Sequence, residues 1–181
     1  MVEFGFSKDK NIFFECKNEM GCRLTYGHKA PEGYRSPAEI SGKILEFLKN
    51  GVPHDNDYPT KKTLITVPAS FQVAQREDTL KAAELAGICI LEGELIDEPI
   101  AAFIDFLLSE NLERKLKQSN KLLVFDFGGG TCDVAVYRID SNISSECLDV
   151  SPLTVSRYHR LGGGDIDRAI IHQVLLPQLL E

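Results

Sequence analysis

Hydrophobic and polar residues alternate along this chain with two different periods, and the longer period predicts helices. The clearest case has apolar residues three or four positions apart, at Ile40, Ile44, Leu45 and Leu48. Ser36 as a cap, Pro37 at the first helical position and Glu39 reaching back predict where this helix begins. Gly51 and Pro53 predict where it ends.

Three further helices are expected. Ser70 is the candidate cap of the second helix, and Gly87 suits its C-terminus. The apolar side of this helix is expected to carry Val73, Leu80, Ala83 and Gly87, and its polar side Arg76, Glu77, Lys81 and Glu84. The third helix opens at 97–99 and runs through Leu108, and the last spans 166–180 after a glycine-rich loop.

Shorter apolar runs, separated by turn residues, predict strands. They lie at 63–68, 89–96, 121–126, 132–139 and within 146–159, and residues 1–26 are expected to form short strands with an apolar core at 12–14. The two runs within 121–139 are joined by glycines and predict a hairpin, while the charged stretch 110–120 reads as a connector. Because strand and helix alternate over 63–108, the sequence predicts an α/β fold.

The composition is that of a globular protein, with 181 residues of which 43% are hydrophobic and 26% charged. Lys and Arg number 20 against 27 Asp and Glu, and the resulting charge of −7 argues against a nucleic-acid or membrane partner. The five cysteines have no CxxC spacing and are expected to be reduced thiols. We find no signal-peptide pattern and no apolar run of about 18 residues, so a cytoplasmic location is expected.

The feature with the clearest chemistry is the sequence DFGGGTCD at 126–133. Three consecutive glycines at a strand-to-strand turn leave no Cβ between the backbone and a ligand, so their N–H groups can converge on an anion. Asp126 ends one strand and Asp133 begins the next, and two carboxylates beside an anion-binding turn suit a hydrated magnesium ion. Thr131 offers a hydroxyl to the same place.

This motif has two other interpretations. One is a glycine-rich hairpin with two solvated aspartates, which residue types alone do not separate from a phosphate site. The other is the magnesium motif of protein kinases, because 126–128 reads Asp-Phe-Gly. The kinase interpretation fails because neither a glycine-rich loop with its following lysine nor a His-Arg-Asp loop precedes the motif.

The hairpin motif resembles the second phosphate loop of heat shock protein 70 chaperones and their actin-like ATPase relatives. Other family segments occur in the same order, with Thr-Val-Pro-Ala-Ser-Phe at 66–71, Ala-Ala-Glu-Leu-Ala-Gly at 82–87, Asp-Glu-Pro-Ile-Ala-Ala at 97–102 and Leu-Gly-Gly-Gly-Asp-Ile-Asp at 161–167. The resemblance covers residues 63–168, and residues 1–62 are similar only in outline. Together these motifs are highly specific, although each alone is not.

The resemblance implies roles residue by residue. Glu98 matches the glutamate associated with positioning the attacking water, and Asp126 and Thr131 complete the implied catalytic set. Asp126 and Asp133 match the aspartates of the magnesium site. Contacts to ATP are implied for Thr131 and for the glycines Gly128, Gly129, Gly130, Gly162 and Gly163.

Some positions have a simpler alternative, and some depart from the family. The simpler interpretation of Glu98 is an acid that interacts with a helix dipole. Pro68 and Arg76 match family positions linked to communication between domains, and the simpler interpretation of Arg76 is a surface arginine. The departures are Asp97 for asparagine, Ile100 for threonine, Gly164 for glutamate and Cys132 for phenylalanine. Cys132 has two interpretations: its thiol is a redox switch, or the residue is a small buried hydrophobic side chain.

The resemblance implies part of an actin-like ATPase (ribonuclease-H-like) fold, with 1–120 in the first lobe and 121–181 beginning the second. The implied function is that of an ATP-binding chaperone with Mg²⁺, acting on unfolded polypeptides with co-chaperones. A related kinase or reactivating factor, and an interaction module without turnover, are the alternatives. One phosphate hairpin of two is recognised, so the chain is expected to be a segment of a longer parent and not to bind ATP tightly or hydrolyse it alone.

Overall fold

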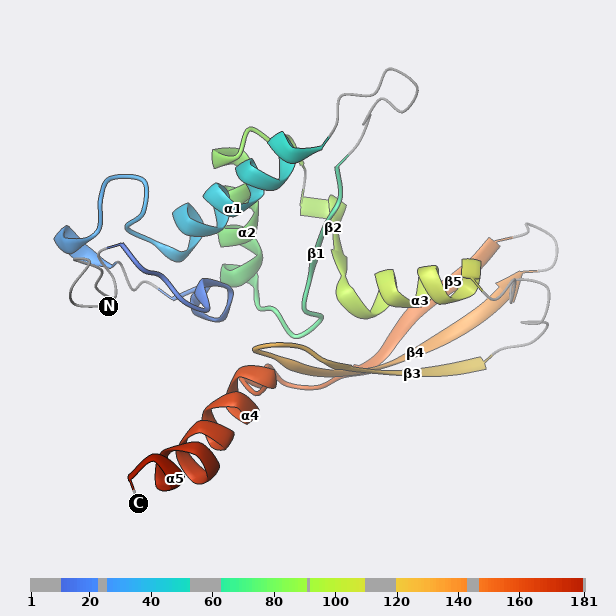
Figure 1. Ribbon diagram of the computed structural model, residues 1–181. Coiled ribbons are helices and arrows are strands. Elements are labelled where there is room, and N and C mark those ends of the chain that lie inside the picture. The colour runs from blue at the N-terminus through green and yellow to red at the C-terminus, as the bar shows by residue number, and fades with distance from the viewer. Residues whose placement is uncertain are drawn as a thin grey trace. The chain divides into compact units, whose positions relative to one another are not determined.

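We describe the computed structural model of the protein for residues 11–22, 26–52, 63–90, 92–109, 120–142 and 147–180. The chain divides into two compact units, each described by itself. The first comprises residues 1–65 and 71–96, and the second comprises 66–70 and 97–181. The expected lobe boundary at residue 120 stays a prediction. Figure 1 shows the helices and strands of both units.

Two packed helices form the centre of the first unit. Helix α1 (Pro37–Gly51) begins as predicted, because Ser36 Oγ accepts a hydrogen bond from Glu39 N at 3.2 Å. It packs on α2 (Val73–Leu85), where a Cβ at Gly42 would lie 3.0 Å from Leu85 Cβ. A glycine in the middle of α1 therefore permits a close approach of the two helices.

The start and the faces of α2 differ from the prediction. The N-terminal cap is Gln72 rather than Ser70, and Gln72 N donates to Gln75 Oε1 at 2.9 Å in a capping-box arrangement. Val73, expected on the buried side, is 69% exposed. The face of α2 that is buried carries Gln75, Thr79, Ala82 and Ala83. Ala83 is buried and Glu77, Lys81 and Glu84 are exposed, as predicted. The apolar pattern misses Gln75 and Thr79 because their side chains are polar.

The C-terminus of α2 is held by a lysine of α1. Gly87 follows the C-terminus of the helix, as predicted, and has a left-handed backbone conformation with φ 65°. Lys49 Nζ donates to the carbonyl oxygens of Ala86 at 3.2 Å and Gly87 at 2.8 Å. The apolar core beside this contact contains Ala83, Ala86 and Ile88.

The expected short strands of 1–26 are wrong for the described residues after 15. Cys16–Glu19 is a short 3-10 helix, and residues 1–10 and 23–25 lie outside the described parts. Glu15 has φ 53° and Gly21 φ 78°, so the backbone turns at both ends of this helix. Gly21 N donates to Asp78 Oδ2 at 2.8 Å, a contact with α2 that a local apolar pattern does not encode.

Strands β1 (Ile65–Val67) and β2 (Leu95–Asp97) pair in a two-stranded sheet. The strand expected at 89–96 is thus shorter and begins at Leu95, because a 3-10 turn at Glu92–Glu94 precedes it. The strand expected at 63–68 is confirmed in a shorter form.

A three-stranded antiparallel sheet forms the centre of the second unit, in the order β3 (Asn120–Phe127), β4 (Cys132–Asn142) and β5 (Cys147–Val155). Helix α3 (Glu98–Ser109) packs on one face, where Phe103 and Leu107 meet Ile139. The hairpin and the third helix are confirmed, whereas the expected connector at 110–120 lies outside the described residues except for Asn120. The mixture of helices and sheet agrees with the predicted α/β class.

The last helix begins three residues earlier than predicted. It consists of α4 (Gly163–Ile170), a π-helical segment (Ile171–Leu175) and α5 (Leu176–Leu180). Within the described ranges, we find no helix with the length and apolar character needed to span a membrane.

Candidate functional site

The predicted turn between two strands is present at Gly128–Thr131. Antiparallel pairing runs up to Phe127 opposite Cys132, and Gly128 N closes the turn by donating to Thr131 O at 2.9 Å. The Gly128 amide is therefore engaged within the turn, contrary to the expectation that the N–H groups of all three glycines converge on an anion. The amides of Gly129, Gly130 and Thr131 are the remaining candidates for an anion at this turn.

The two aspartates of the motif are direct partners across the hairpin. Asp126 on β3 pairs with Asp133 on β4, one position from the end of the ladder. Their side chains lie on the same face, because opposite residues of an antiparallel pair share a face. Asp133 is 1% exposed, and its Oδ1 has no hydrogen-bond partner among the described residues. A buried carboxylate oxygen without a partner is costly unless a cation or a polar ligand meets it.

A second glycine segment, Gly162–Gly164, contacts the turn through the backbone. Gly163 N donates to Gly128 O at 2.9 Å, and Gly164 N donates to Gly129 O at 2.8 Å. A Cβ on Gly162 would lie 2.4 Å from Gly130 N, a separation that the packed backbones do not allow. The family-like glycines at 128–130 and 162–163 are thus brought together.

This packing changes the interpretation of two predicted ligand residues. Gly162 is buried, and its lack of a side chain is explained by the neighbouring backbone without any ligand. Gly163 donates its amide to Gly128 O, so in this conformation the amide is not available to a phosphate. The nucleotide-binding roles of Gly162 and Gly163 stay predictions. Through the contacts described here, the two residues would fix the shape of the Gly128–Thr131 turn.

Thr131 and Cys132 lie where the turn returns into β4. Thr131 is buried, and its Oγ1 would lie 3.8 Å from a Cβ at Gly128. Cys132 N donates to His159 O at 3.2 Å, which joins the end of the turn to the segment before α4. The thiol of Cys132 is half-buried, and its proposed redox role stays a hypothesis.

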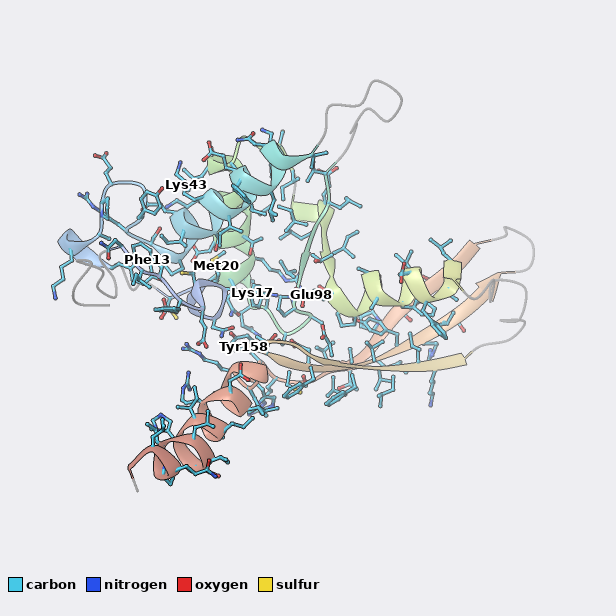
Figure 2. All side chains as sticks on the ribbon, viewed as in Figure 1. Phe13, Lys17, Met20, Lys43, Glu98 and Tyr158 are labelled. Carbon is cyan, nitrogen blue, oxygen red and sulfur yellow. The ribbon has the colours of Figure 1, made fainter. Side chains whose placement is uncertain are left out.

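Glu98 is the first residue of α3, as predicted, and is labelled in Figure 2. Leu122 and Asp126 are four residues apart on β3 and therefore lie on the same face of the sheet. Leu122 packs against the Phe103 and Leu107 cluster, so α3 covers the face that carries the aspartates. Glu98 thus belongs to a helix on that side of the sheet, and the direction of its carboxylate toward the site stays a prediction.

Two residues linked by resemblance to domain communication have local structural contacts. Pro68 is fully buried after β1. Arg76 is half-buried, and its Nε donates to Phe71 O at 3.2 Å. This bond gives Arg76 a role at the start of α2, and the communication role stays a prediction.

Sequence reasoning missed Asp165, which supports the second glycine segment. Asp165 Oδ2 accepts a hydrogen bond from Gly162 N at 2.9 Å, and Asp165 Oδ1 lies 3.3 Å from Arg168 Nη1. The sequence signal for Asp165 is an acidic residue in the first turn of a helix that follows a glycine loop.

The fold and this arrangement agree with the comparison with known proteins. The family model described as Hsp70 protein matches residues 9–176. The chain belongs to the Hsp70 family, and its fold is the α/β fold of the actin-like ATPases.

Similar curated proteins are named as chaperones. The chain is 37% identical over 155 residues to the chaperone protein HscA homolog of Acinetobacter baumannii (strain SDF). It is 39% identical over 155 residues to the chaperone protein DnaK of Mycoplasmopsis agalactiae. Each match covers 86% of this chain and 23% of the relative, so the chain spans about a quarter of the length of these relatives. The family supports the chaperone interpretation over a kinase or a reactivating factor.

Proposed function

We propose that the β3–β4 hairpin binds the phosphates of ATP together with Mg²⁺ in an Hsp70-type chaperone. The observation that carries the proposal is the buried Asp133, whose Oδ1 has no partner among the described residues, directly opposite Asp126. Carboxylate oxygens are the ligands that Mg²⁺ prefers, and the ion usually keeps several waters between protein and phosphate.

Each residue of the site has a distinct part in this proposal. Asp126 and Asp133 would hold the hydrated ion, and the amides of Gly129–Thr131 would donate to phosphate oxygens. Thr131 would add its hydroxyl, and Glu98 would orient the water that attacks the terminal phosphate. The bound Mg²⁺ would supply positive charge that offsets the phosphate oxygens.

The activity of the whole protein is part of the same proposal. An ATP-dependent chaperone would act on unfolded polypeptides with co-chaperones, in the cytoplasm and in response to stress. About three quarters of the length of each relative lies outside the region that matches this chain. Because each phosphate contact adds to affinity, we expect the 181-residue chain alone to bind ATP more weakly than micromolar and not to hydrolyse it above background.

Titration calorimetry of the 181-residue chain with ATP tests the proposal, with and without Mg²⁺. We expect weak, Mg²⁺-dependent binding that Asp133→Asn abolishes. Asp149→Asn is the matched control, because Asp149 is an exposed aspartate on β5 of the same sheet. Binding that is indifferent to Mg²⁺, or unchanged in Asp133→Asn, would overturn the proposal. A micromolar dissociation constant would show that the single hairpin contributes much more than we infer.

A further inference from the structure

The position of the phosphate-binding turn depends on the backbone of a second segment. Two carbonyl groups of the turn, those of Gly128 and Gly129, accept hydrogen bonds from Gly163 N and Gly164 N. A shift of the Gly162–Gly164 segment would therefore move these carbonyls or break both bonds. Because each peptide unit is planar, rotating the Gly129 carbonyl also rotates the amide of Gly130.

The Gly162–Gly164 segment has little conformational restraint of its own. Glycine populates more backbone conformations than any other residue, so consecutive glycines need an external contact to adopt one of them. Asp165 supplies contacts from both its backbone and its side chain. Its N donates to Gly162 O at 3.0 Å, and its Oδ2 accepts from Gly162 N at 2.9 Å.

Arg168 completes this arrangement one turn along α4. Its Nη1 lies 3.3 Å from Asp165 Oδ1, while the other carboxylate oxygen contacts Gly162. The two oxygens of Asp165 are thus used by different partners, which fixes the plane of the carboxylate. The Asp165 side chain is 40% exposed and that of Arg168 60%, so the ion pair adds orientation more than stability.

We propose that Asp165 is a positioning residue for the phosphate-binding turn. It holds Gly162 in place, Gly163 and Gly164 in turn hold the carbonyls of Gly128 and Gly129, and the remaining amides of the turn keep their direction. Its effect on a ligand rests on the proposed function, whereas its effect on the ligand-free turn does not. A residue that only capped α4 would change the helix and leave the turn unaffected.

The test compares Asp165→Ala, Asp165→Asn and the control Asp167→Ala in the ¹⁵N-labelled 181-residue chain. Asp167 is an exposed acid of the same helix, two residues further on. Without ligand, Asp165→Ala should shift the amide resonances of Gly128–Thr131 and speed hydrogen exchange at Gly163 and Gly164 by roughly fivefold, the factor that corresponds to the free energy of a typical capping interaction. Asp165→Asn should largely restore both, because its amide oxygen can still accept from Gly162 N. Asp167→Ala should leave both unchanged.

A second measurement separates positioning from simple stabilisation. Inorganic pyrophosphate with Mg²⁺ is titrated into each variant, and the amides of Gly129–Thr131 are followed. We expect Asp165→Ala to weaken this binding several-fold, with recovery in Asp165→Asn. Unshifted turn resonances in ligand-free Asp165→Ala, or shifted resonances with wild-type pyrophosphate affinity, would overturn the proposal. If the wild-type turn does not respond to pyrophosphate, the proposed function fails, and the ligand-free comparison alone decides whether Asp165 positions the turn.

Discussion

Asp133 is buried directly opposite Asp126 in the β3–β4 ladder, one position from the glycine turn. Two acids on one face of neighbouring strands repel each other, and like charges directly opposite are destabilising in a sheet. Asp133 Oδ1 has no hydrogen-bond partner among the described residues, which adds a desolvation cost. The pair is therefore unfavourable for folding without a cation, which is the arrangement expected where stability is sacrificed for binding.

The first prediction concerns the stability of this pair. In metal-free buffer, Asp133→Asn should raise the free energy of unfolding by roughly 1–2 kcal/mol, because it replaces a buried carboxylate whose Oδ1 has no partner in the described parts of the chain. Urea denaturation followed by circular dichroism measures the change. Asp149→Asn, on the exposed part of β5, should have little effect. A clear loss of stability in Asp133→Asn would contradict our interpretation of the site.

The second prediction uses two glycines with opposite surroundings. Gly162→Ala should destabilise the protein by about 1–3 kcal/mol, because the added Cβ would meet Gly130 N at 2.4 Å. Gly129→Ala is the matched variant, since no atom of the described residues lies within 4 Å of a Cβ there. Thermal unfolding of both should show a large drop only for Gly162→Ala, and equal effects would show that the two segments do not pack as described.

The third prediction concerns the cap that α1 provides for α2. Lys49→Met should cost about 0.5–1 kcal/mol, because it removes the donor to the carbonyls of Ala86 and Gly87 at the negative end of the helix dipole. Lys43→Met is the control, because Lys43 forms an exposed ion pair with Glu46 within α1 at 2.9 Å. Denaturant titration should separate the two variants, and a larger loss for Lys43→Met would refute the cap.

The fourth prediction is that the stability contributed by Tyr26, in the first unit, depends on pH in the alkaline range. Burial raises the pKa of Tyr26 well above its usual value of about 10, and hydrogen bonds with Cys16 and Glu19 raise it further. A pKa that is higher in the folded protein contributes stability below about pH 10, and this contribution is lost as the pH rises further. The stability difference between wild type and Tyr26→Phe should therefore decrease above about pH 10. A difference that is constant from pH 8 to pH 11, measured by denaturant titration, would contradict the shift.

Local signals in the sequence predicted the elements that carry the site. The alternation in 121–139 with glycines between identified the hairpin, and the Glu98-Pro99 pair identified the start of α3. These predictions succeeded because turn residues and helix starts act over a few residues.

Contacts between distant segments were not predictable in the same way. A 3-10 helix forms near residue 16 where a strand was expected, and the hydrogen bond from Gly21 N to the Asp78 carboxylate ties this segment to a residue 57 positions away. The contact of Gly162 with Gly130 likewise gives a packing reason for a glycine whose implied role is to contact ATP, and that role stays a prediction. The engagement of the Gly128 amide inside the turn depends on the turn's conformation, which three glycines leave open.

The measurement that tests the central claim most directly places a divalent cation on the hairpin. Mn²⁺, a paramagnetic substitute for Mg²⁺, is titrated into the ¹⁵N-labelled chain, and the broadening of each amide resonance is recorded. If Asp126 and Asp133 hold the ion, the amides of residues 126–133 should broaden first, and Asp133→Asn should remove this effect while Asp149→Asn leaves it intact. Broadening that begins elsewhere, such as at the acidic residues of α2, or that persists at the hairpin in Asp133→Asn, would contradict the account.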